Sequence, residues 1–86
     1  MEQKIIVRKS YDSRGKIKSI YGVDELNRNH GTTFMYYPFP YNYIVREIVE
    51  FNHGIIHGNR TILKVDGTIF VQEIYNKGQL VKYSYP

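Results

Sequence analysis

Hydrophobic residues alternate with polar ones over short runs, and they do not recur at helical spacing over any window of helical length. The runs are rich in Ile, Val, Tyr and Phe, and Gly, Asn and Asp interrupt them every eight to twelve residues. This rhythm is typical of antiparallel hairpins. We predict an all-β meander of six to seven strands, at residues 4–11, 16–23, 32–37, 43–51, 55–65, 68–75 and 79–85.

The breaks between these runs contain residues that form tight turns. Asp66-Gly67 supplies the positive φ angles of a two-residue hairpin turn. Asn52-His53-Gly54 and Asn76-Lys77-Gly78 both end in Gly, which suits a turn closed by a G1 bulge. We therefore expect hairpins at these positions.

Period-two alternation indicates which face each strand buries. In residues 43–51 it groups Val45, Val49 and Phe51 on one side, opposite Arg46, Ile48 and Glu50. Apolar residues also fall on the nominally polar side, so we expect both faces of the sheet to be partly apolar. These residues are Ile20, Ile48, Phe70 and Ile74.

Residues 34–43 contain six aromatic side chains in ten positions, and Pro38 and Pro40 break any regular strand between them. We predict a long, proline-bent loop between strands. Tyrosine-rich surface is common in protein interfaces because it offers large contact area at small entropic cost. We expect partner contacts from Tyr36, Tyr37, Phe39, Tyr41 and Tyr43. The alternative role for these aromatics is to cover a thin sheet that has no opposing layer.

The length of 86 residues predicts one domain spanning residues 1–86, too small to enclose a deep catalytic pocket. The net charge is +4, and the whole excess lies in the first twenty residues. Such a basic hairpin could contact nucleic acid phosphates or an acidic protein surface, or serve only as a solvated edge. Its cations are Lys4, Arg8, Lys9, Arg14, Lys16 and Lys18.

The chain has no Cys, which excludes disulfides, thiolate metal sites and thiol nucleophiles. No run reaches the roughly 18 apolar residues of a membrane span, and the first residues lack a secretory hydrophobic region. We therefore expect a cytoplasmic protein without a transmembrane segment.

No residue pattern predicts catalysis or a cofactor. His53 and His57 lie four residues apart, a spacing that could bind zinc on a helix, but Gly54 and Gly58 place them in a hairpin, and no third ligand is evident. We therefore predict that these histidines have structural roles at turns and strand starts and bind no metal. His30 has the same interpretation. Glu47 and Glu50 fall on opposite sides of a strand, and the serines and glycines form neither a nucleophile elbow nor a phosphate loop.

The chain contains an internal repeat. Residues 51–56 align with residues 75–80, aromatic on aromatic, Asn on Asn and Gly on Gly. Residues 11–17 align in the same way with residues 63–69, and His30-Gly31 aligns with His57-Gly58. One hairpin cannot bury its apolar face alone, so repeated hairpins must stack edge to edge.

These residues resemble the bacterial MORN-variant repeats, in particular the YwqK-like antitoxin group. Residues 51–58, Phe-Asn-His-Gly-Ile-Ile-His-Gly, follow one part of that repeat, and Tyr11 to Ser19 follow another. About two and a half to three units cover most of residues 8–83, and residues 39–42 interrupt the second unit. The resemblance implies a scaffold of MORN-like β-hairpins without catalytic residues.

We therefore predict a non-enzymatic protein-binding module. We expect a small inhibitor or anti-defence protein that blocks a toxin or other effector in a bacterial or phage conflict system, and the resemblance implies the antitoxin-like kind. One alternative is a nucleic-acid-binding protein that uses the basic hairpin; another is a MORN-type scaffold on an anionic membrane surface. We also expect the C-terminal edge strand, with Val81, Tyr83 and Tyr85, to pair with a second copy or a partner strand.

Overall fold

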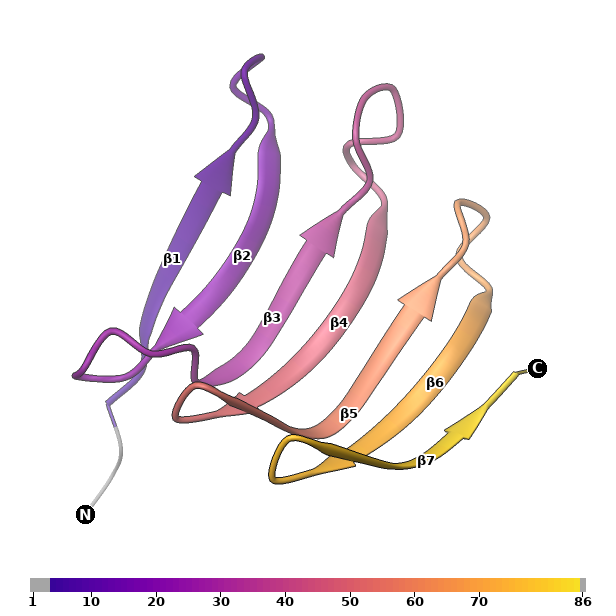
Figure 1. Cartoon of the computed structure of the whole chain (residues 1–86). Coiled ribbons are helices and arrows are strands. Elements are labelled where there is room, and N and C mark those ends of the chain that lie inside the picture. The colour runs from indigo at the N-terminus through magenta and orange to yellow at the C-terminus, as the bar shows by residue number, and fades with distance from the viewer. Residues whose placement is uncertain (1–3, 86) are drawn as a thin grey trace.

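The computed structural model describes residues 4–85, which form one antiparallel sheet of seven strands in a meander, as the sequence predicts (Figure 1). No strand bound differs by more than two residues from its predicted position. The described residues contain no helix, and so none that could span a membrane. The strands are β1 (Ile6–Tyr11), β2 (Ile17–Val23), β3 (Gly31–Tyr36), β4 (Val45–Asn52), β5 (Ile55–Leu63), β6 (Ile69–Asn76) and β7 (Gln79–Ser84).

The sheet contains three hairpins of the same construction, β1–β2, β3–β4 and β5–β6, followed by the single strand β7. In each hairpin the register shifts once near the turn, and beyond the shift Tyr11 aligns with Ile17, Tyr36 with Val45, and Leu63 with Ile69. One backbone hydrogen bond then closes each loop, from Asp12 N–H to Lys16, from Tyr37 N–H to Ile44 and from Lys64 N–H to Thr68. The repeat predicted from the sequence is thus a structural repeat, in the same alignment.

The register divides the side chains between two faces of a sheet whose smallest extent is 17 Å. We call one the valine face, because it carries Val23, Val49 and Val71, the buried apolar side chains of residues 4–85. The opposite face carries one row of aligned residues that crosses all seven strands. That row is Lys9, Ile20, Phe34, Ile48, Thr61, Gln72 and Ser84.

The prediction that both faces are partly apolar is confirmed. Ile20 and Ile48 lie in the row opposite the valine face, and Phe34 lies between them. The predicted grouping of Val45 with Val49 and Phe51 is wrong. A β-bulge aligns Val45 with Tyr36, so Val45 leaves the alternation that Val49 and Phe51 follow.

The turn after β2 illustrates how side chains shape the loops. Asp24 Oδ1 accepts hydrogen bonds from the backbone N–H groups of Leu26 (2.9 Å) and Arg28 (3.0 Å). Asn27 takes the left-handed conformation with φ 63°, the place that Gly15 and Gly67 occupy in the first and third hairpin turns. Asn therefore substitutes for a turn glycine here.

Candidate functional site

A groove of about 270 Å³ opens between β2 and β3, at the end of the sheet that holds the aromatic loop. Only two residue pairs align these strands, Ser19 with Met35 and Ile20 with Phe34, whereas six align β3 with β4. Figure 1 shows the two ribbons diverging beyond this short ladder. Because the β2–β3 ladder ends after these two pairs, side chains line the space between the two strands at this end.

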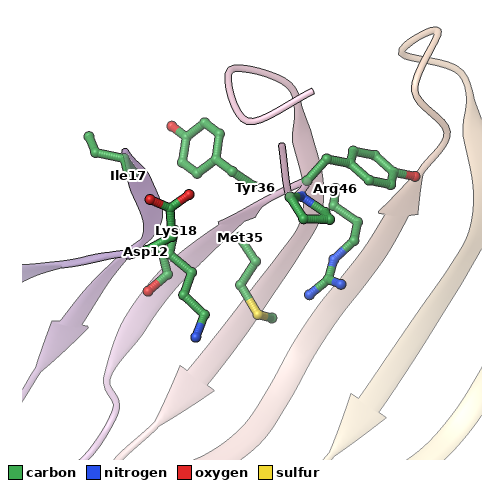
Figure 2. A pocket seen from close by; sticks show the side chains of 9 residues that line it. Asp12, Ile17, Lys18, Met35, Tyr36 and Arg46 are labelled. Carbon is green, nitrogen blue, oxygen red and sulfur yellow. The ribbon is translucent and has the colours of Figure 1, made fainter. Parts of the chain in front are cut away.

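The groove has a cationic and partly apolar lining. Lys18 and Arg46 lie on either side of Met35, and the Tyr36 ring lies near the mouth (Figure 2). Neither Lys18 nor Arg46 forms an ion pair with any residue from 4 to 85. An anionic group entering the groove would therefore meet two cations that no described carboxylate neutralises.

Asp12 is the carboxylate in this lining. Its Oδ1 accepts hydrogen bonds from the backbone N–H groups of Lys16 (3.0 Å) and Arg14 (2.8 Å). The bond from Lys16 is the main cause that lowers the pKa of Asp12, and the bond from Arg14 adds to it. Asp12 thus stays charged near neutral pH while its oxygen holds the turn together.

The aromatic loop, residues 37–44, is fixed at both sides of the groove. The Tyr37 hydroxyl donates a hydrogen bond to the carbonyl of Leu63, in the next hairpin. The Arg14 guanidinium lies 3.9 Å from the centroid of the Phe39 ring, a cation–π contact with the first hairpin. The loop therefore connects all three hairpins.

The five aromatics predicted to contact a partner divide into two groups. Tyr36 and Tyr37 are half-buried and line the groove. The rings of Phe39, Tyr41 and Tyr43 are 58%, 45% and 76% exposed on the loop. The loop that carries these three rings begins at Tyr37 and Pro38, which line the groove.

The six basic residues predicted from the sequence do not form one patch. Lys9 lies on the face opposite the valine face, and Arg8 lies on the valine face. Lys18 is the extra residue at the bulge of β2 and lines the groove. Arg14 and Lys16 are in the turn, and Lys4 precedes β1. Sequence reasoning missed Arg46, which occupies in β4 the bulge position that Lys18 occupies in β2. The internal repeat was the signal that could have found it.

A second polar cluster lies at the opposite end of the sheet, in the turns after β2 and β4. The Nδ1 of His53 lies 2.7 Å from Asp24 Oδ2, which also accepts a 2.8 Å bond from Arg28 Nε. His30 stacks on His53 with ring centroids 4.2 Å apart, and its Nδ1 accepts the His53 backbone N–H. Partial desolvation of Asp24 raises its pKa, but the hydrogen bonds from His53 and Arg28 together lower that pKa well below its usual value.

Asp24 and the Nδ1 atoms of His30 and His53 all take part in these hydrogen bonds, which join one hairpin to the next. Among residues 4–85, no three His, Cys, Asp or Glu side chains are grouped so that they could hold a metal ion. The cluster therefore has the geometry of a structural connection between turns.

A third polar cluster crosses the valine face. Arg60 on β5 donates a 2.7 Å hydrogen bond to Glu47 on β4 and another of 2.7 Å to Glu73 on β6. The Tyr75 hydroxyl donates to the same Glu73 oxygen. The bond from Arg60 is the main cause that lowers the pKa of Glu73. Each charge in this cluster has a partner, so it connects three strands and leaves no free group for a ligand.

Comparisons with protein families, with curated proteins and with solved structures found no match for this chain. The likeness to MORN-variant repeats therefore depends on the residues quoted above. The geometry of the groove and of the aromatic loop carries the functional argument.

Proposed function

We propose that this chain is a non-enzymatic protein-binding module, a small inhibitor of the antitoxin-like kind that blocks a partner protein. The observation that carries the proposal is the position of the aromatic loop beside the cationic groove. The loop with the exposed rings begins at Tyr37 and Pro38, and these two residues line the groove together with Lys18 and Arg46. Aromatic and Arg side chains are the residues that supply most binding energy in protein interfaces.

The restraints on the loop support the same function. Tyr37 and Arg14 tie the loop to neighbouring hairpins, so the rings of Tyr41 and Tyr43 are presented from a fixed frame. A loop that is ordered before binding loses less conformational entropy when a partner docks. The shape of the sheet, a single layer 17 Å in its smallest extent, suits contact with another surface.

Capture of the partner tests this proposal. The tagged protein is incubated with a lysate of its source organism, and bound proteins are identified by mass spectrometry. We expect a partner whose own activity the chain inhibits, and weaker capture by the Tyr41→Ser/Tyr43→Ser variant. The matched control is Leu26→Ser, which removes a 72% exposed apolar side chain from the turn after β2, at the opposite end of the sheet.

Two results would contradict the proposal. One is recovery of no partner by the wild type. The other is a complex with nucleic acid that weakens steeply between about 50 and 200 mM salt, the signature of phosphate contacts. The latter would favour the nucleic-acid alternative, and pelleting with anionic liposomes alone would favour the membrane-surface alternative.

A further inference from the structure

We infer that the groove between β2 and β3 anchors an acidic segment of the partner protein. A Glu or Asp carboxylate of that segment binds between Lys18 and Arg46, and a neighbouring apolar side chain packs on Met35. The inference rests on the proposed function and specifies the chemistry that the partner must present.

A difference between two equivalent residues of the hairpin repeat accounts for the open groove. Asp12 and Tyr37 both line it, and each donates the backbone N–H that closes the loop of its own hairpin. The Tyr37 hydroxyl reaches the next hairpin, where it donates a hydrogen bond to the carbonyl of Leu63. The Asp12 carboxylate instead accepts bonds from its own turn, from the N–H groups of Arg14 and Lys16. At this repeat position, the side chain of the first hairpin therefore leaves the space beside the second hairpin open.

Lys18 and Arg46 also hold equivalent positions, as the extra residues at the bulges of β2 and β4. A β-bulge adds one residue to a strand and redirects the side chains beside it. Both cations line the groove, on either side of Met35 (Figure 2). Both are exposed, and neither forms an ion pair with a carboxylate of residues 4–85. An anionic ligand would therefore displace no described ion pair when it binds them.

The carboxylates beside these cations have other partners. Asp12 is the one carboxylate of the lining, and its Oδ1 holds the turn. Glu47 follows Arg46 in β4, but it accepts a 2.7 Å hydrogen bond from Arg60. Two positive charges thus face one negative charge in the groove. Charge complementarity therefore selects an acidic ligand.

The rest of the lining is mainly apolar, and the space is small. Pockets that hold whole drug-sized molecules have volumes of about 300–1,000 Å³. The groove has about 270 Å³, so it fits one or two side chains of a larger partner better than a whole small molecule. An acidic residue next to an apolar one would contact both the cations and the apolar lining. That apolar lining comes from Ile17, Met35, Tyr36, Tyr37 and Pro38.

The neighbouring loop favours a protein as the source of the carboxylate. Tyr37 and Pro38 line the groove and are the first residues of the aromatic loop. A guanidinium such as that of Arg46 binds a carboxylate through two parallel N–H···O bonds, and the Lys18 ammonium adds a point charge. Such contacts supply specificity in protein interfaces. The groove therefore suits an acidic anchor residue of a protein segment.

Titration of three synthetic peptides of about ten residues tests the inference, with binding followed by the amide shifts of the nitrogen-15-labelled protein in NMR. The first peptide contains Glu-Phe-Glu, the second Gln-Phe-Gln and the third Glu-Ser-Glu. We expect the first to bind at least about tenfold more tightly than the second, because it carries the charge opposite to that of the groove. It should bind at least about threefold more tightly than the third, because Phe buries apolar surface. The shifts should be largest at Lys18, Met35 and Arg46.

Variants of the protein locate the binding. Lys18→Glu/Arg46→Glu should weaken binding of the Glu-Phe-Glu peptide at least about tenfold. The matched control is Lys9→Glu/Lys82→Glu, which changes the net charge equally through two exposed lysines on the face opposite the valine face. It should alter the affinity by less than about threefold in 0.15 M salt, where charges more than about 8 Å away are screened.

Replacement of Asp12 gives a gain of binding that a loss of folding cannot imitate. Asp12→Asn keeps a side-chain oxygen that can accept the turn hydrogen bonds but removes the negative charge from the lining. We expect the Glu-Phe-Glu peptide to bind at least about twofold more tightly to this variant. Circular dichroism and a thermal melt establish that each variant is folded.

Four results would overturn the inference. They are equal affinity for the Glu-Phe-Glu and Gln-Phe-Gln peptides, no saturation by about 5 mM peptide, amide shifts located away from the groove, and no gain of affinity in Asp12→Asn. Tighter binding of a single-stranded oligonucleotide at the same amides would also overturn it, since the groove would then be a phosphate site.

The partner recovered by capture separates the failure of this inference from that of the proposed function. If that partner binds the wild type and the Lys18→Glu/Arg46→Glu variant equally, the acidic-anchor inference is wrong and the protein-binding function stands. If no partner is recovered, the proposed function itself fails.

Discussion

The Nδ1 atom of His57 accepts a 3.0 Å hydrogen bond from the backbone N–H of Lys77, which lies in the turn before the last strand. His30 accepts the backbone N–H of His53 in the same way, one hairpin earlier. The residue that donates this backbone N–H has positive φ in both turns, 51° at Lys77 and 46° at His53. A histidine at the start of one hairpin thus holds the following turn, as expected of a repeat whose units contact their neighbours.

Removing the His57 acceptor should destabilise the sheet. His57→Ala leaves the Lys77 N–H to water, and we expect a loss of about 0.5–1 kcal/mol in the free energy of unfolding. His57→Asn should lose less, because its side-chain oxygen can accept the same bond. Urea denaturation measures both, and equal losses would show that the acceptor is not the cause.

Gly58 should tolerate a side chain less well than Gly67. Both have positive φ, 102° and 88°. A Cβ at Gly58 would lie 3.1 Å from Glu50 Oε1, whereas a Cβ at Gly67 would point into open space. We expect Gly58→Ala to cost about 1 kcal/mol more than Gly67→Ala in the same denaturation experiment. An equal cost would mean that Glu50 moves away freely.

Arg60 should contribute more to stability than an exposed arginine. Arg60→Met leaves Glu47 and Glu73 without their shared cation on the valine face, and we expect a loss of about 1–3 kcal/mol. Arg46→Met is the control, because Arg46 is exposed and forms no ion pair with residues 4–85, and it should change stability by about 0.5 kcal/mol or less. Similar losses in both variants would contradict this role.

Asp24 should make folding stability sensitive to acid. Because its pKa is lowered in the folded protein from 3.8, the stabilisation it supplies is complete above that value and declines as the pH falls below it. Thermal melts at several pH values should show a shallower decline for Asp24→Asn than for the wild type. A decline of the same steepness in both would assign the acid sensitivity to other carboxylates.

The strand β7 should support self-association. It lies at the edge of the sheet, all of its residues are exposed, and Val81 is 60% exposed. We predict dimers at high protein concentration in analytical ultracentrifugation, and weaker dimerisation of Val81→Lys, because edge charges discourage strand pairing. A wild-type protein that stays monomeric at millimolar concentration would refute this prediction.

Strand positions, turns and the repeat could all be predicted from the sequence. They depend on neighbours along the chain, such as the period-two alternation around Val49 and the positive φ at Gly67. The exposure of Phe39 and Tyr41 on a loop was also predictable, because Pro38 and Pro40 interrupt the strand pattern there.

The groove was not predictable, because it depends on where pairing between two hairpins stops. That point follows from the bulges at Arg46 and Lys18 and from the length of the β2–β3 ladder. Alternation within one strand does not reveal a bulge, and so the sequence misassigned Val45.

By itself, the sequence determined a meander of repeated hairpins and a positive net charge. The sequence also places the whole excess of positive charge in the first twenty residues. Only the tertiary structure decided that Lys18 and Arg46 line one groove with Met35. It also decided that Arg60 is neutralised by Glu47 and Glu73 on the valine face. The physical reason is that the register between strands distant in sequence, with one residue added at each bulge, decides the face on which a side chain lies.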